Sequence, residues 1–160
     1  MTAAMGIDPG VNGGISVVDS RRNVLFCQPL KRNMTQKEVV AVVKLGAIAL
    51  TTAGGKACFI EKVGYMPNDG GQGANTFGRV DGLLRGAAHA FGLTVKDVAP
   101  LMWQARLECL TGGNKNISKH RAIQLFRDRV PRITHSTADS LLIAEYGLQL
   151  LETDDVRSFL

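Results

Sequence analysis

The 160-residue sequence has no apolar run that approaches the length of a membrane span. Its first residues also lack the basic-then-apolar layout of a secretory signal peptide. Cysteines are few and odd in number, and their positions match no metal-ligand spacing: Cys27, Cys58 and Cys109. These absences suit a reducing compartment, so we expect a cytoplasmic protein.

Acidic residues are the scarcer charge. The chain has 14 Asp and Glu against 19 Lys and Arg, which gives a formal charge of +5 and a pI near 9.4. This balance favours a polyanionic partner, although a basic surface with no partner is an alternative. With 45% hydrophobic and 21% charged residues, residues 1–160 are expected to form one globular domain.

Local patterns predict an α/β domain. Three short strands are expected to form an antiparallel meander, at 5–9, 14–19 and 23–29. Thr35 and Glu38 then form a capping box for a helix. The apolar run 57–60 predicts a parallel strand that returns through this crossover, and a fifth strand is expected at 93–95. The prediction is a mixed five-stranded sheet flanked by helices.

The remaining helices are predicted from caps and apolar spacing. They are expected to begin near Asn75, near Pro100, after a Ser118 cap and at about Thr137. The helix near Pro100 carries Trp103, which we assign to the core.

A carboxylate ends the first apolar strand, in the stretch Gly6-Ile7-Asp8-Pro9-Gly10. An unpaired carboxylate there is costly to desolvate, and no Lys or Arg lies nearby in sequence. A metal ion is therefore one candidate partner for Asp8. The alternative is a turn-capping aspartate in an Asp-Pro-Gly reverse turn.

Two further carboxylates stand at the edges of apolar elements. Glu61 follows 57–60, and a mixed sheet of this order can bring it beside Asp8. Asp139 lies in the first turn of the predicted last helix, where an acidic residue usually complements the helix dipole. Clustered carboxylates need compensation, which Mg²⁺ with waters and phosphate oxygens provides. The set points to metal-assisted phosphodiester hydrolysis.

Three motifs occur in order, and further agreement comes from 77–79, 98–104 and 145–147. The motifs are Gly6-Ile7-Asp8-Pro9-Gly10, Phe59-Ile60-Glu61-Lys62-Val63 and Ala138-Asp139-Ser140-Leu141-Leu142-Ile143-Ala144. Together they resemble the RuvC-type Holliday junction resolvases, particularly the bacteriophage-like branch. The likeness is collinear over nearly the whole chain. The first motif alone is weak, because sugar kinases and actin-like ATPases carry a similar turn.

This resemblance implies an RNase H-like fold and a homodimer in a bacterial or phage-infected cell. It implies Mg²⁺-dependent, symmetric nicking of four-way DNA junctions, with Mn²⁺ able to substitute. By position, the metal ligands would be Asp8, Glu61 and Asp139. The family's fourth ligand, Asp or His, falls here at Ser136, which is a departure. His135 shares a face with Asp139 if the helix begins early, and is then a candidate ligand or proton carrier. Otherwise Ser136 is the equivalent, or His135 is a cap or surface residue.

The resemblance also implies the DNA contacts. The candidates are Lys115, Lys119, His120, Arg121, Arg79 and Tyr65. A solvated helix face is the alternative for the basic residues, and a half-buried loop aromatic is the alternative for Tyr65. The expected dimer element is the helix at 75–91, whose small residues permit close packing: Gly82, Gly86, Ala87 and Ala88.

Two other functions stay open. One is a broader branched-DNA nuclease of the same fold that cuts flaps or forks. The other is a non-catalytic junction-binding protein, which the serine at position 136 allows.

Overall fold

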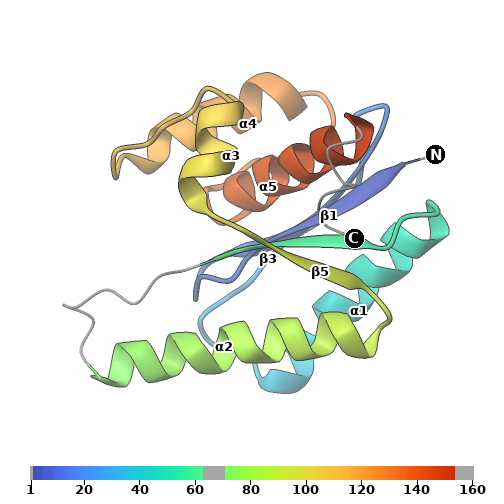
Figure 1. The fold of residues 1–160 in the computed structure, drawn as a ribbon. Coiled ribbons are helices and arrows are strands. Elements are labelled where there is room, and N and C mark those ends of the chain that lie inside the picture. Colours follow the sequence, from blue (N-terminus) through green and yellow to red (C-terminus); the bar gives the residue numbers. More distant parts are fainter. Residues whose placement is uncertain (1, 63–70, 154–160) are drawn as a thin grey trace.

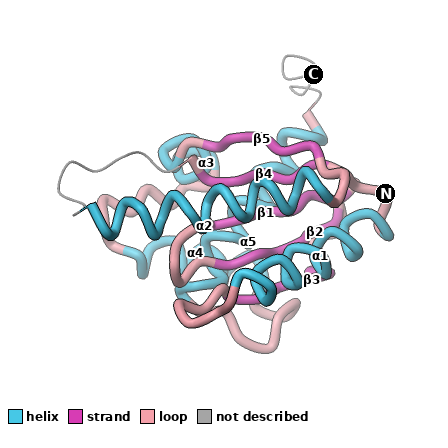
Figure 2. The backbone as a smooth tube through the Cα atoms, turned by 90° about the horizontal axis from the view of Figure 1, so that it is seen from below, coloured by secondary structure: helices cyan, strands magenta, loops and turns pink. Residues whose placement is uncertain are grey.

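The fold is known from a computed structural model that describes residues 2–62 and 71–153. Its strands are Ala3–Asp8 (β1), Gly14–Asp19 (β2), Val24–Pro29 (β3), Ala57–Glu61 (β4) and Thr94–Val98 (β5). Its helices are Gln36–Thr52 (α1), Gly71–Ala90 (α2), Pro100–Arg106 (α3), Lys115–Phe126 (α4) and His135–Glu152 (α5). The strands form one sheet in the order β3-β2-β1-β4-β5, which Figure 2 shows from one face.

The predicted mixed sheet is confirmed. β1 pairs antiparallel with β2, and β2 pairs antiparallel with β3, so the first three strands form the expected meander. β4 returns after α1 and pairs parallel with β1, and β5 pairs parallel with β4. Because Ile7 pairs with Ile60, the next residues along each strand, Asp8 and Glu61, reach the same edge of the sheet.

The predicted starts of two helices are wrong. α4 begins at Lys115, because the Asn114 side chain accepts a hydrogen bond from the Asn116 amide at 3.1 Å and caps the helix before Ser118. α5 begins at His135, because Thr134 precedes it as N-cap and the Thr134 amide donates to the Thr137 hydroxyl at 3.0 Å. Asp139 consequently lies in the second turn of α5 and not in the first.

Boundary differences also affect other elements. β1 spans 3–8 where 5–9 was expected, and β5 spans 94–98 where 93–95 was expected. α2 begins at Gly71, ahead of the expected Asn75. These ends carry few local signals, so sequence patterns locate them only to within a few residues.

Helices cover both faces of the sheet. In Figure 1, α1 and α2 lie below it, and α3, α4 and α5 lie above it. Side chains of β1 alternate between the two layers. Met5 and Ile7 join the core between the sheet and helices α1 and α2, while Ala4 joins the core between the sheet and α5.

Glycine allows α5 to approach the sheet closely. A Cβ atom on Gly6 would lie 2.3 Å from the Ala144 nitrogen and the Ser140 oxygen, both backbone atoms of α5. A Cβ atom on Gly14 would lie 2.3 Å from the Ser136 oxygen. The helix backbone therefore rests directly on β1 and β2, and this contact fixes Asp139 relative to Asp8.

Candidate active site

Asp8 is the last residue of β1 and is half-buried. Its Oδ1 accepts a hydrogen bond from the Gly10 amide at 3.0 Å, so the turn-capping role considered for this residue is present. Burial raises the pKa of Asp8, and the charge of Asp139 raises it further. The Gly10 hydrogen bond and the charge of Lys115 oppose that rise.

Glu61 is the last residue of β4 and is also half-buried. Its Oε2 accepts a hydrogen bond from the indole Nε1–H of Trp103 at 2.7 Å. Burial raises the pKa of Glu61 to about 7, against the lowering effect of the Trp103 hydrogen bond. The charges of Asp8 and Asp139 add to the rise.

Asp139 projects from α5 and completes the group. Its Oδ1 is buried and has no hydrogen-bond partner within the described part of the chain. Burial raises the pKa of Asp139, while a hydrogen bond from Ser118 and the charges of Lys115 and His135 lower it. A buried, unpartnered carboxylate oxygen is uncommon and calls for a missing partner.

The structure thus brings the three predicted carboxylates into mutual electrostatic range at one edge of the sheet. Within residues 2–62 and 71–153, no group of three His, Cys, Asp or Glu side chains is arranged so that it could hold a metal ion. Mg²⁺ does not need three protein ligands, because it takes one or two carboxylates and completes its shell with waters and substrate oxygens. The unpartnered Asp139 oxygen and the raised pKa values of the three carboxyl groups fit a hard divalent cation at this place.

His135 and Ser136 open α5. His135 is exposed at the first helical position, four residues before Asp139, so the early start that a shared face requires is present. Its charge lowers the pKa of Asp139, which indicates proximity. The Ser136 carbonyl faces Gly14. The roles of both side chains at a metal remain predictions.

Lys115 is a basic residue whose charge acts on all three carboxylates. It is exposed at the first position of α4, and its charge lowers the pKa of Asp8, Glu61 and Asp139. Three other predicted DNA contacts lie on the same helix: the half-buried Lys119 and Arg121 and the exposed His120.

Arg121 is already used within the fold. Its Nε donates to the Leu107 carbonyl at 2.8 Å, and a second nitrogen donates to Gln124 at 3.2 Å. The side chain therefore ties α4 to the end of α3, and a DNA contact from it remains a prediction.

Arg79 is not brought to the carboxylates. It is exposed on α2, on the opposite face of the sheet from α4 (Figure 1). There it lines a cavity of about 190 Å³ together with Arg32. Tyr65 lies outside the described residues.

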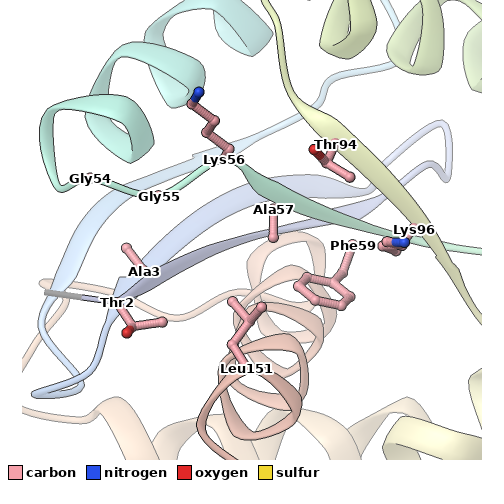
Figure 3. A pocket seen from close by; sticks show the side chains of 10 residues that line it. All are labelled: Thr2, Ala3, Gly54, Gly55, Lys56, Ala57, Phe59, Thr94, Lys96 and Leu151. Atoms are coloured by element: carbon pink, nitrogen blue, oxygen red, sulfur yellow. The ribbon is translucent and has the colours of Figure 1, made fainter. Parts of the chain in front are cut away.

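Another cavity, of about 320 Å³, opens at the far end of the strands. Figure 3 shows Ala3 and Ala57, near the starts of β1 and β4, beside Phe59 and Leu151. The carboxylates stand at the opposite ends of the same strands, and no acidic residue is among the described residues that line this cavity. It is therefore separate from the candidate site.

Trp103 is the site residue that sequence reasoning missed. Its assignment to the core is confirmed, since it is 1% exposed, but its indole also contacts Glu61. A signal was available: it is the only tryptophan of the chain, and a buried indole N–H needs an acceptor.

Neither a protein-family model nor a curated protein matches this chain. Solved structures do. The Thermus thermophilus RuvC in complex with Holliday junction substrate matches with a TM-score of 0.70 at 21% identity, over 96% of both chains. T. thermophilus RuvC alone matches with a TM-score of 0.66 at 21% identity, over 95% of this chain and 96% of that one. The yeast mitochondrial Holliday junction resolvase Ydc2 matches with a TM-score of 0.52 at 11% identity, over 98% of this chain and 83% of that one.

These likenesses confirm the predicted fold. The chain has the RNase H-like fold of RuvC, with its mixed five-stranded sheet flanked by helices. They do not confirm the bacteriophage-like branch, which remains a prediction.

Proposed function

We propose that this protein is a structure-selective endodeoxyribonuclease that resolves four-way DNA junctions by Mg²⁺-dependent phosphodiester hydrolysis. The observation that carries the proposal is the gathering of Asp8, Glu61 and Asp139 at one sheet edge of a RuvC-like fold. Two of the matching solved proteins are described by their junction substrate or junction-resolving activity, which supports DNA junctions as the substrate class.

In this proposal the three carboxylates would share the binding of Mg²⁺, one or two of them to each ion together with waters and phosphate oxygens, with Mn²⁺ as a substitute. The bound ion would activate a water for in-line attack and stabilise the leaving oxygen. His135, exposed four residues before Asp139, would accept the proton of that water. Lys115 would hold the phosphate against the acidic group, because its charge already acts on all three carboxylates.

The DNA arms would lie over α4, where Lys119 and His120 extend the positive surface from Lys115. A homodimer formed through α2 would make the nicks symmetric. Ala87 and Ala88 are buried in the protein's own core, so of the four small residues predicted for this contact only Gly82 and Gly86 are available to a partner.

Among the described residues, no helix combines the length and apolarity needed to cross a membrane.

The test is cleavage of a mobile four-way junction with both product strands mapped. We expect paired nicks in Mg²⁺ or Mn²⁺ and none in EDTA. Asp8→Asn should bind the junction but not cut it, and the exposed Asp128→Asn should behave as wild type. Equal cutting of flaps and forks would favour the broader nuclease, and tight binding without any cut would favour the non-catalytic protein. Intact junctions, flaps and forks in both metals would refute a nuclease.

A further inference from the structure

The indole of Trp103 reaches the candidate site from within the core. Its ring lies in a cluster with Phe126, Leu107 and other residues beneath α3, α4 and α5, and it is 1% exposed. Its Nε1–H donates to Glu61 Oε2 at 2.7 Å. A buried indole N–H must find an acceptor, and an ionised carboxylate is a stronger acceptor than a neutral group.

The fold fixes this donor through short connections. Glu61 pairs with Val98 at the end of the parallel β4–β5 ladder. Pro100 then begins α3 two residues after Val98, and its ring is suited to the first helical turn. Trp103 thus follows within a single turn and lies against the end of β4. The Leu107 amide donates to the Trp103 carbonyl at 3.0 Å, which holds the backbone, and the buried core cluster packs around the ring.

Glu61 makes no second hydrogen bond or ion pair among the described residues. Oε2 therefore already accepts a hydrogen bond from the indole, whereas Oε1 accepts none from the described residues. A carboxylate held in this way cannot offer both oxygens equally to an ion.

We propose that Trp103 is a positioning residue that reserves Oε2 of Glu61, so that Glu61 binds the divalent cation through Oε1 alone. The inference rests on the proposed function, because it concerns the same cation. A single-oxygen ligand suits Mg²⁺, which demands near-octahedral geometry and keeps several waters. Partners that orient a metal ligand in this way typically contribute 10–100-fold to metal affinity.

The first test uses the only tryptophan of the chain as its own reporter. A ¹H–¹⁵N spectrum of the protein contains one indole Nε1–H signal. Titration with Mg²⁺ should shift this signal until it saturates. Glu61→Gln keeps an acceptor for the indole but removes the charge, and its indole signal should stay unmoved. An unmoved wild-type signal at saturating Mg²⁺ would overturn the inference.

The second test removes the donor alone. Trp103→Phe keeps an aromatic ring in the core and loses the N–H, and its Mn²⁺ affinity measured by calorimetry should fall about 10-fold or more. Phe126→Leu perturbs the same core without a bond to Glu61 and should bind Mn²⁺ as wild type. A folded Trp103→Phe with wild-type affinity would overturn the inference. If that variant fails to fold, the indole titration decides.

Failure of the proposed function and failure of the inference about Trp103 would give different results. A wild-type protein that binds no Mn²⁺ in calorimetry and cuts no branched DNA would refute the proposed function and, with it, this inference. A protein that binds Mn²⁺ and cuts junctions, but whose indole signal does not shift on titration with Mg²⁺, would refute only the role of Trp103.

Discussion

Replacing Glu61 with glutamine should make the metal-free protein more stable at pH 8. Burial raises the pKa of Glu61 to about 7 from an ordinary value of 4.5, and the neighbouring carboxylates add to the rise. Below pH 4.5 the group is protonated in both the folded and the unfolded chain, so it costs nothing. Between pH 4.5 and 7 the unfolded chain loses the proton first, and the free energy of unfolding falls as the pH rises. Above pH 7 the full cost is present.

The size of that cost follows from the pKa difference. At 1.36 kcal/mol per pH unit, a rise from 4.5 to about 7 corresponds to at most about 3 kcal/mol. Glu61 retains some contact with water, so we expect about 2 kcal/mol. For a chain of this size, that equals roughly 4–8 °C in Tm. The glutamine variant is neutral and escapes this cost, and its amide oxygen still accepts the Trp103 hydrogen bond.

The assay is thermal unfolding in EDTA at pH 5 and pH 8, repeated at pH 8 with Mg²⁺. The Tm of Glu61→Gln should clearly exceed that of wild type at pH 8 and differ little from it at pH 5. Mg²⁺ at ten times its Kd should stabilise wild type by about 1.4 kcal/mol and the variant by much less. Glu108→Gln, at an exposed position, controls for the change in net charge. A variant advantage that is absent, or equal at both pH values, would refute the reasoning.

The remaining predictions concern the packing of α5 on the sheet, a buried ion pair and the charge of Lys115. Gly6→Ala puts a methyl group 2.3 Å from α5 backbone atoms, so urea unfolding should show a loss of about 3 kcal/mol or more. Arg22→Met leaves the buried Glu145 without its 2.9 Å ion pair, and urea unfolding should show a loss of about 3 kcal/mol. Lys115→Ala removes a charge that repels a cation, so Mg²⁺ should bind more tightly in calorimetry while junction binding weakens several-fold.

Each of these variants has a matched control. Gly78→Ala changes a glycine with nothing within 4 Å and should be neutral or slightly stabilising. Arg127→Met removes an exposed arginine and should change stability by less than about 0.5 kcal/mol. Lys44→Ala, on the exposed side of α1, should leave Mg²⁺ affinity unchanged. Equal effects of variant and control would contradict the corresponding prediction.

Features specified by neighbouring residues were predictable from the sequence. The capping box of α1 is present, with the Glu38 amide donating to the Thr35 hydroxyl at 3.2 Å and the Thr35 amide donating to Glu38 at 2.7 Å. The parallel direction of β4 was predictable because a long helix between strands implies a parallel return. The pairing of β4 with β1 then brings Asp8 and Glu61 to one edge.

Features that depend on competition or on distant contacts were not predictable. Asn114 and Ser118 are equally good caps by residue type, and only tertiary packing, which buries Ser118, selects Asn114. The bond from Trp103 to Glu61 joins positions 42 residues apart, so no local pattern reports it.

The position of Asp139 would link the proposed metal binding to the stability of the fold. α5 rests on β1 through Gly6, with no side chain between the two backbones, so the helix cannot shift outward without losing this packing. Asp139 therefore cannot relieve its repulsion with Asp8 and Glu61 by a small movement of its helix. Protonation or a cation must relieve it instead. Such repulsion at an otherwise well-packed edge fits the proposed metal site, since an apolar residue at any one of these positions would reduce the repulsion.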